Sequence, residues 1–371
     1  MYSSYSPLQQ SQLAAQGYYD TQSTYLLVYA PGRNTALRAT LADQLHRKFR
    51  LADTLGSALT EGVDGVLLVS EDVECMSTAL MCFAKALQDG ADYAVCNAVF
   101  GFGGATALYQ SRAHLAQNRC ALVSRPLLER CRAAAKDPEN VTELLALAAQ
   151  FCAHPARIPQ ALLHYERDIC AEDAFSATGK RAFLMSHVLD MTGAPIVLVS
   201  AVPVLRSMGY EVVVLGPSDG GALQLFVDAG AAVITRPGIR ATPNLWGLAL
   251  CTDLVLVNTV VMARTVRALS GTAVPVLWWL HDAFAGYPHI AHQIPTKLAE
   301  NVRLYSVGHH AANAMHAVRP DFQIGQLIYG LPDYAAENFV HTDLGYNHGR
   351  PLFATVGSFE RRKGHDIFCK A

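Results

Sequence analysis

The stretch FLMSHVLDMTGAPIVLVSAVPVLRSMGYEVVVLGP, residues 183–217, decides the fold of this chain. It begins as a short apolar run, passes through a loop that contains Gly193, continues as an apolar segment of helix length, and returns to a second apolar run after Gly209. Apolar runs without polar alternation are typical of strands buried on both faces of a parallel sheet. A glycine between a helix and the next strand supplies the left-handed residue that ends the helix. The stretch therefore predicts a β-α-β unit.

The same alternation continues toward the C-terminus. Apolar strand-like runs occur at residues 181–186, 211–216, 231–236, 253–258, 274–281, 303–308 and 323–330. Segments of helix length separate these runs, and an alternation of this kind predicts an α/β domain with a Rossmann-like, doubly wound parallel sheet. We assign residues 181–345 to this domain.

The residues before this domain are less regular. We predict a smaller α/β domain at residues 24–168. We predict a linker at residues 169–180, which are small and polar. We predict a flexible leader at residues 1–23, which lack the features of a signal peptide. The elements expected in the smaller domain are strands at 24–31 and 63–74 and helices at 36–49, 77–90 and within 125–153.

Composition excludes several functional classes. With 29 Lys and Arg against 31 Asp and Glu, the chain has no net field that would attract nucleic acid. Its nine cysteines show neither a CxxC pair nor a zinc-site spacing, and they predict a reducing compartment. The longest uncharged run, residues 93–111, contains three glycines and predicts a strand with a glycine-rich loop rather than a membrane helix.

The loop at 186–198 is the first candidate site. Gly193 there allows a backbone N–H to approach a phosphate or a sugar at a helix N-terminus. An ordinary strand-to-helix turn explains the loop equally well. The loop is not a GxGxxG sequence, so a dinucleotide site is not supported.

Histidines follow two of the predicted strands. His281 is the last residue of the run at 274–281 and Asp282 follows it, and His187 comes directly after the run at 181–186. These positions lie at the carboxyl edge of the sheet, where α/β proteins bind ligands. An imidazole there can hydrogen-bond a sugar hydroxyl or a phosphate, although a single histidine is more often structural. The pair His309-His310 is expected at the surface or at a helix start.

Two charged stretches are further candidates. In LFATVGSFERRKGHDIFCKA, residues 352–371, a predicted strand at Leu352–Val356 is followed by a basic turn and a helix beginning at Gly364. Lys363 in that turn could bind a diphosphate, or the turn could simply be solvated. In LLVSEDVE, residues 67–74, acidic side chains after a buried strand could hold a divalent metal, although the only other possible ligands near Asp72 are Glu71 and Glu74.

The stretches at 183–217 and 352–368 resemble glycosyltransferase family 4, the retaining enzymes of GT-B fold, and the resemblance covers residues 180–371. It implies that 181–345 is an acceptor lobe and that 346–371 begins a donor lobe. The implied reaction transfers a sugar, with retention, from a nucleotide-diphosphate sugar to a glycan or lipid-linked acceptor. The family's usual setting is cell-envelope or surface polysaccharide synthesis in the cytoplasm, with peripheral membrane contact allowed.

The resemblance also implies roles for single residues. Gly193 corresponds to the glycine loop that faces the donor diphosphate, His281 to the catalytic-site histidine near the transferred sugar, and Lys363 to the lysine that holds the diphosphate. Ser358 stands where the family often has an arginine. The family uses the nucleotide sugar as co-substrate and implies neither a cofactor nor a bound divalent metal. The remaining assignments are Thr192, Ala194, Ser358 and Arg362 to the diphosphate, and His187 and Asp282 to the acceptor.

Residues 24–168 more faintly resemble a glycosyltransferase of family 2, a GT-A fold. The family's aspartate-rich metal motif corresponds here to Ser70-Glu71-Asp72. The strand that carries the family's first nucleotide-binding aspartates is expected to be missing between Phe49 and Leu55, and Glu143 is the only carboxylate in the stretch expected to hold the catalytic base. The resemblance therefore implies a degenerate domain that acts as a scaffold or positions the acceptor.

Three interpretations remain open on sequence alone. In the first, the chain is a fragment or truncated product of a two-lobed transferase, and it is expected to transfer no sugar by itself. In the second, it is a non-catalytic scaffold or glycan-binding protein derived from transferase domains. The third, a Rossmann oxidoreductase, is weakened by the missing GxGxxG sequence.

Overall fold

The structure is a computed structural model, and it divides the chain into two units, Met1–Tyr329 and Gly330–Ala371, which are considered separately. It describes residues 19–32, 34–56, 62–101, 119–175, 179–239, 247–330, 353, 355, 357 and 363–370, and the backbone alone of residues 106–110.

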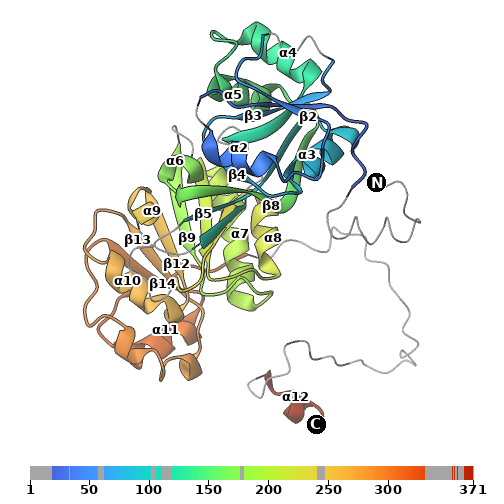
Figure 1. Cartoon of the computed structure of the whole chain (residues 1–371). Coiled ribbons are helices and arrows are strands. Elements are labelled where there is room, and N and C mark those ends of the chain that lie inside the picture. Colours follow the sequence, from blue (N-terminus) through green and yellow to red (C-terminus); the bar gives the residue numbers. More distant parts are fainter. Residues whose placement is uncertain are drawn as a thin grey trace. The chain divides into compact units, whose positions relative to one another are not determined.

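The C-terminal half of the first unit is built on a parallel sheet (Figure 1). Its strand order is β15-β14-β13-β12-β9-β10-β11, and every neighbouring pair is parallel. The predicted doubly wound parallel sheet is therefore confirmed. The strands are β9 (Lys180–Met185), β10 (Tyr210–Gly216), β11 (Ala232–Thr235), β12 (Leu254–Asn258), β13 (Val276–Leu280), β14 (Val302–Ser306) and β15 (Ile324–Gln326).

Helices cover both faces of these strands. Along β9, Ala182 and Leu184 pack with one set of helices, whereas Phe183 and Met185 pack in a different cluster with the other set. This alternation explains why the strands are apolar on both sides. The first set is α7 (Gly193–Ser207) and α8 (Ala222–Asp228), and the second is α9 (Gly247–Leu250), α10 (Ala263–Leu269) and α11 (His309–His316).

Two glycines end helices where the sequence predicts that they should. Gly209 follows α7 at φ +85° and Gly230 follows α8 at φ +95°. Only glycine adopts this conformation without strain, so each helix ends there and the chain turns into the next strand. Within the described part of the chain, no helix combines the length and apolar character needed to cross a membrane.

The N-terminal half of the first unit contains a mixed sheet of order β6-β5-β7-β3-β1-β2. Strand β1 is parallel to β2 and β3, whereas β7 is antiparallel to β3 and β5. The long strand β8 pairs with β4 and β5. The strands are β1 (Leu26–Tyr29), β2 (Phe49–Ala52), β3 (Gly65–Val69), β4 (Glu74–Cys75), β5 (Tyr93–Gly101), β6 (Thr106–Gln110), β7 (Cys120–Ser124) and β8 (Pro155–Asp168).

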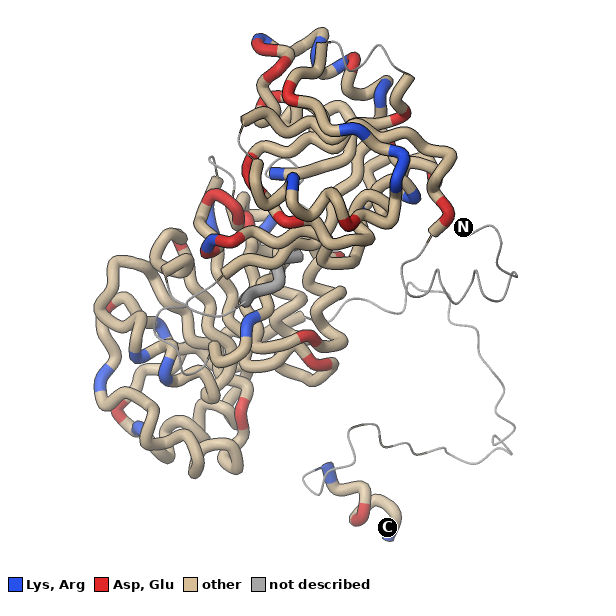
Figure 2. The backbone as a smooth tube through the Cα atoms, viewed as in Figure 1, with Lys and Arg blue, Asp and Glu red and all other residues tan. Residues whose placement is uncertain are grey.

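Helices again lie on both faces of this sheet. Helices α2 (Thr35–Leu41) and α3 (Ala79–Gln88) pack in one cluster, and α4 (Arg125–Ala134) and α5 (Val141–Phe151) pack in another. Strand β6 is also antiparallel to β11, with Ile234 opposite Tyr109. The strands of both halves therefore belong to one hydrogen-bonded sheet. Figure 2 shows basic and acidic residues interspersed along the described backbone.

Three expected elements differ in the structure. The prediction of a helix over 36–49 is wrong after Leu41, where α2 ends. Beyond that point the buried Gln44 side chain donates to the Met76 carbonyl at 2.9 Å and accepts from the Leu80 N–H at 3.0 Å. The strand expected to be missing after Phe49 is present as β2, and Asp53 follows it. The last strand of the parallel sheet, β15, is shorter than the strand predicted at residues 323–330.

One arginine joins several segments near the end of β8. Arg167 donates to the Asp173 carboxylate at 2.6 and 2.9 Å and to Glu71 at 2.6 Å. Its guanidinium also lies over the rings of Phe100 and Tyr165, 5.3 and 5.5 Å from their centroids. Asp173 belongs to the short helix α6 (Ala171–Ala174), and its side chain is only 3% exposed. A buried carboxylate of this kind needs its cationic partner.

We predict that Arg167→Ala lowers the free energy of unfolding by about 3 kcal/mol, because it leaves the buried Asp173 carboxylate without its main partner. Among the described residues, the remaining partners of the Asp173 carboxylate are the Cys170 N–H at 2.9 Å, the Cys170 thiol at 3.1 Å and Arg119 at 3.8 Å, and these are too weak to replace two short charge-assisted bonds. Urea unfolding followed by circular dichroism measures the change.

The control is Arg125→Ala, which removes the exposed pair with Glu129 and should cost less than about 1 kcal/mol. Equal losses in the two variants would show that Asp173 is hydrated and that the Arg167 contacts are not central to stability.

Candidate active site

The order of the parallel strands reverses beside β9. Strand β9 lies between β10 and β12, so the chain leaves β9 toward one side of the sheet and later returns to its other side at β12. Open α/β sheets bind their ligands at this switch point, beyond the carboxyl ends of the strands. The loop from Ser186 to Thr192 and the turn η5 (Val260–Met262) follow β9 and β12 at this edge.

The loop after β9 presents the N-terminus of α7. Thr192 occupies the N-cap position, but its side chain makes no capping hydrogen bond. Gly193 is exposed, and a Cβ at this position would meet no atom within 4 Å. The first turn of a helix carries unpaired N–H groups and a partial positive charge, which together attract anions. The sequence-predicted residues Thr192, Gly193 and Ala194 therefore lie where an anionic group could bind.

Asn258 attaches this helix to the end of β12. Its amide donates to the Ala194 carbonyl at 3.0 Å, and the residue is fully buried. Its Oδ1 atom has no hydrogen-bond partner within the described residues. Sequence reasoning missed Asn258, although a single polar residue that ends the apolar run DLVLVN was a usable signal.

His281 lies just beyond β13. Its ring centroid is 4.8 Å from that of Trp279, with the planes tilted by 55°, and its buried Nε2 has no hydrogen-bond partner among the described residues. Burial, and then the neighbouring His187, lower the pKa of His281 to about 4. The imidazole is therefore neutral at physiological pH. The structure thus brings His187 and His281, predicted separately, into the same neighbourhood.

Asp282 points back into the protein. Its Oδ2 accepts the Val260 N–H at 2.6 Å, which ties the end of β13 to the turn after β12. Burial raises the pKa of this carboxyl, and backbone hydrogen bonds, the first of them from Val260, oppose the shift. This contact shows Asp282 holding the edge of the sheet together, and its predicted contact with an acceptor stays a prediction.

Thr259 has the most unusual backbone at this edge. With φ +70° and ψ 163°, it is the one non-glycine residue of positive φ in the described ranges, and it is buried. This conformation costs a β-branched residue about 1–3 kcal/mol. The Thr259 N–H donates to the Trp279 carbonyl at 2.8 Å, and the Trp278 indole donates to the Thr259 carbonyl at 2.7 Å. Its hydroxyl lies 3.3 Å from His187 Nδ1.

The acidic pair of the N-terminal half has structural partners. The Asp72 carboxylate accepts the Thr35 hydroxyl and the N–H groups of Ala36 and Leu37 at 3.0–3.1 Å, so it caps α2. Burial raises the pKa of Asp72, but these hydrogen bonds outweigh it and the net shift is downward. Glu71 is paired with Arg167 at 2.6 Å. Across the described residues, no group of three His, Cys, Asp or Glu side chains could hold a metal ion.

Glu143 also has a structural role. Its carboxylate accepts the N–H groups of Lys136 and Asp137 at 2.9 and 3.2 Å, and so it fixes the loop that enters α5.

The second unit is described only in part. Lys363 is exposed, Gly364 adopts φ +69°, and the short helix α12 (His365–Phe368) follows. The predicted strand ends, Leu352 and Val356, and the candidate residues Ser358 and Arg362 lie outside the described residues.

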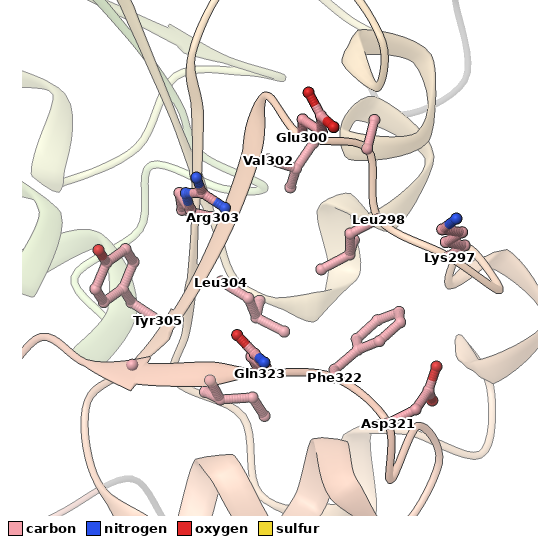
Figure 3. Close-up of a pocket in the computed structure, with 13 residues that line it drawn as sticks. Lys297, Leu298, Glu300, Val302, Arg303, Leu304, Tyr305, Asp321, Phe322 and Gln323 are labelled. Carbon is pink, nitrogen blue, oxygen red and sulfur yellow. The ribbon is translucent and has the colours of Figure 1, made fainter.

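A cavity of about 670 Å³ lies beside β14 and β15 (Figure 3). Arg303, Tyr305, Phe322 and Gln323 are among the residues that line it. The residues predicted for the active site do not line this cavity.

We predict that the His281 ring stays neutral as the pH falls from 7 to about 5, because burial disfavours its charged form. NMR titration of histidine-labelled protein measures this, with the His281→Gln variant used to assign the signal. In urea-unfolded protein the same imidazole should titrate near 6.5, the ordinary histidine value. A His281 midpoint between about 6 and 7 in the folded protein would show that the ring is hydrated.

We predict that Asp72→Ala destabilises the fold by about 1 kcal/mol, the usual cost of losing a helix cap. Asp53→Ala, which removes an exposed pair with Arg38, is the control and should have a smaller effect. Thermal unfolding with and without Mn²⁺ is the measurement. A midpoint that Mn²⁺ raises in the natural protein but not in Asp72→Ala would instead identify Asp72 as a metal ligand.

Residues 178–316 match the family model described as Glycosyl-transferase family 4. No match was found among curated proteins or among solved structures. The matched residues include the α7 N-terminus, Thr259 and both histidines of the candidate site. By this match, the segment that carries the candidate site is similar to glycosyltransferase family 4, and the similarity supports a glycosyltransferase-like function.

Proposed function

We propose that the chain serves the transfer of a sugar, with retention, from a nucleotide-diphosphate sugar to a glycan or lipid-linked acceptor in cell-envelope or surface polysaccharide synthesis. One observation carries the proposal. The segment that matches family 4 contains, at the carboxyl edge of its sheet, an exposed helix N-terminus together with a half-buried, neutral histidine.

The N-terminus of α7 suits a diphosphate. In a transfer of this kind the leaving diphosphate gains negative charge, and N–H donors that are already oriented stabilise that charge. A hydrogen bond from a backbone N–H to a charged phosphate oxygen contributes about 1.5–3 kcal/mol. The bond from Asn258 to the Ala194 carbonyl supports this role, because it holds the first turn of α7 in place.

A neutral imidazole suits a sugar. His281 can accept from or donate to a hydroxyl without bringing a second positive charge beside the diphosphate site. Its Nε2 atom, which has no partner in the described part of the chain, supports this role, since a buried polar atom without a partner costs about 1–3 kcal/mol that a ligand could recover. The assignments of Lys363, Arg362 and Ser358 to a diphosphate stay predictions.

A second function, as a non-catalytic scaffold or glycan-binding module, is favoured for residues 24–168. The observation behind it is that Asp72 caps a helix and Glu71 pairs with Arg167, so neither carboxylate is available to a metal without breaking a structural contact.

We predict that Gly193→Ala weakens binding of nucleotide-diphosphate sugars at least tenfold, about 1.4 kcal/mol, because a methyl group would separate the phosphate from the backbone. The fold should not suffer, since Gly193 is helical and a Cβ there meets open space. Calorimetry with UDP- and GDP-sugars measures the affinity, and transfer to oligosaccharides is then assayed with the sugar that binds.

Gly56→Ala is the matched control, because a Cβ at Gly56 also meets no atom within 4 Å and the residue lies outside the family 4 match. Equal affinities in the two variants would remove the α7 N-terminus from the site. Glycan binding without any nucleotide-sugar binding in the natural chain would favour the scaffold function.

A further inference from the structure

The hydroxyl of Thr259 has one described partner. Thr259 is 1% exposed, and its Oγ1 lies 3.3 Å from the Nδ1 atom of His187. A buried hydroxyl needs an acceptor for its hydrogen, because an unmet donor away from water costs about as much as a lost hydrogen bond. The imidazole nitrogen is the acceptor that this geometry offers.

The direction of this hydrogen bond decides where the His187 proton lies. If Nδ1–H donated to Thr259, the buried hydroxyl hydrogen would have no acceptor among the described residues. If the hydroxyl donates to the Nδ1 lone pair, the hydroxyl hydrogen is satisfied and the ring proton must be on Nε2. The second arrangement is the one without a buried unmet donor.

We propose that Thr259 is a positioning residue that holds neutral His187 in the tautomer protonated at Nε2, so that His187 acts as a hydrogen-bond donor rather than as a base. The donor would serve an oxygen of the sugar or of the phosphate, and this last clause rests on the proposed function. The tautomer itself does not depend on that function.

The strained backbone supports a role for the side chain. A glycine would adopt φ +70° without strain, yet this position carries a β-branched residue whose hydroxyl meets the histidine. The contacts from Trp278 and Trp279 hold the backbone of Thr259, and the Val260 N–H that follows is bound by Asp282 at 2.6 Å. Both neighbours therefore stabilise a conformation that aims the hydroxyl at His187.

The experiment compares His187 tautomers by NMR of protein labelled with ¹⁵N in its histidines, at a pH where the ring is neutral. The signals are assigned by their loss in His187→Gln. Thr259→Val keeps the shape and the strain but removes the hydroxyl, Thr259→Ser keeps the hydroxyl, and Thr259→Gly removes both the hydroxyl and the strain. Thr265→Val is the control, because Thr265 is equally buried and its hydroxyl has no partner among the described residues.

The natural protein and Thr259→Ser should show mainly the Nε2-protonated form. In Thr259→Val and Thr259→Gly the ratio of the two tautomers should shift about fivefold toward the Nδ1-protonated form, the change expected for one lost hydrogen bond. Thr265→Val should leave the ratio unchanged.

A natural protein protonated mainly at Nδ1, an unchanged ratio in Thr259→Val, or an equal shift in Thr265→Val would each overturn the proposal. Thr259→Gly adds a second readout. It should unfold at a higher urea concentration than Thr259→Val, because its backbone is unstrained, while it shares the altered tautomer ratio. A failure to bind any nucleotide sugar would count against the proposed function and would leave the tautomer result standing.

Discussion

The candidate site depends on one constraint, the burial of a parallel sheet on both faces. Strands β9 to β15 can be covered only if the helices that connect them lie on both sides, and the strand order must then reverse where the covering changes side. That reversal lies between β9 and β12. It leaves the loops after these strands facing one another, and it is why α7 and Thr259 meet at one edge.

Several features that cost free energy lie close together at this edge of the sheet. Thr259 carries backbone strain, and two buried atoms, His281 Nε2 and Asn258 Oδ1, have no hydrogen-bond partner within the described ranges. Each of these costs on the order of 1–3 kcal/mol. The packed strands around them tolerate such costs because Trp278 and Asp282 hold the turns from behind. Strain and unmet polar atoms at one edge are typical of a place that binds a ligand.

The N-terminal half uses its charged residues differently. Asp72 caps the start of α2, Glu71 pairs with Arg167, and Glu143 accepts hydrogen bonds from a loop backbone. Arg167 joins Glu71 to Asp173, which precedes β9 in the chain. Carboxylates with such partners stabilise the fold.

The sequence by itself determined the alternation of strands and helices, the glycine stops at Gly209 and Gly230, and the placement of His187 and His281 after strands. These features follow from local periodicity and from backbone conformations that single residues favour. Only the tertiary structure decided that Gln44 leaves the helix expected at 36–49 and that Thr259 adopts a glycine-like backbone and meets His187. The physical reason is that partners far apart in the chain, such as the carbonyl of Met76 or the indole of Trp278, supply the hydrogen bonds that override local preference.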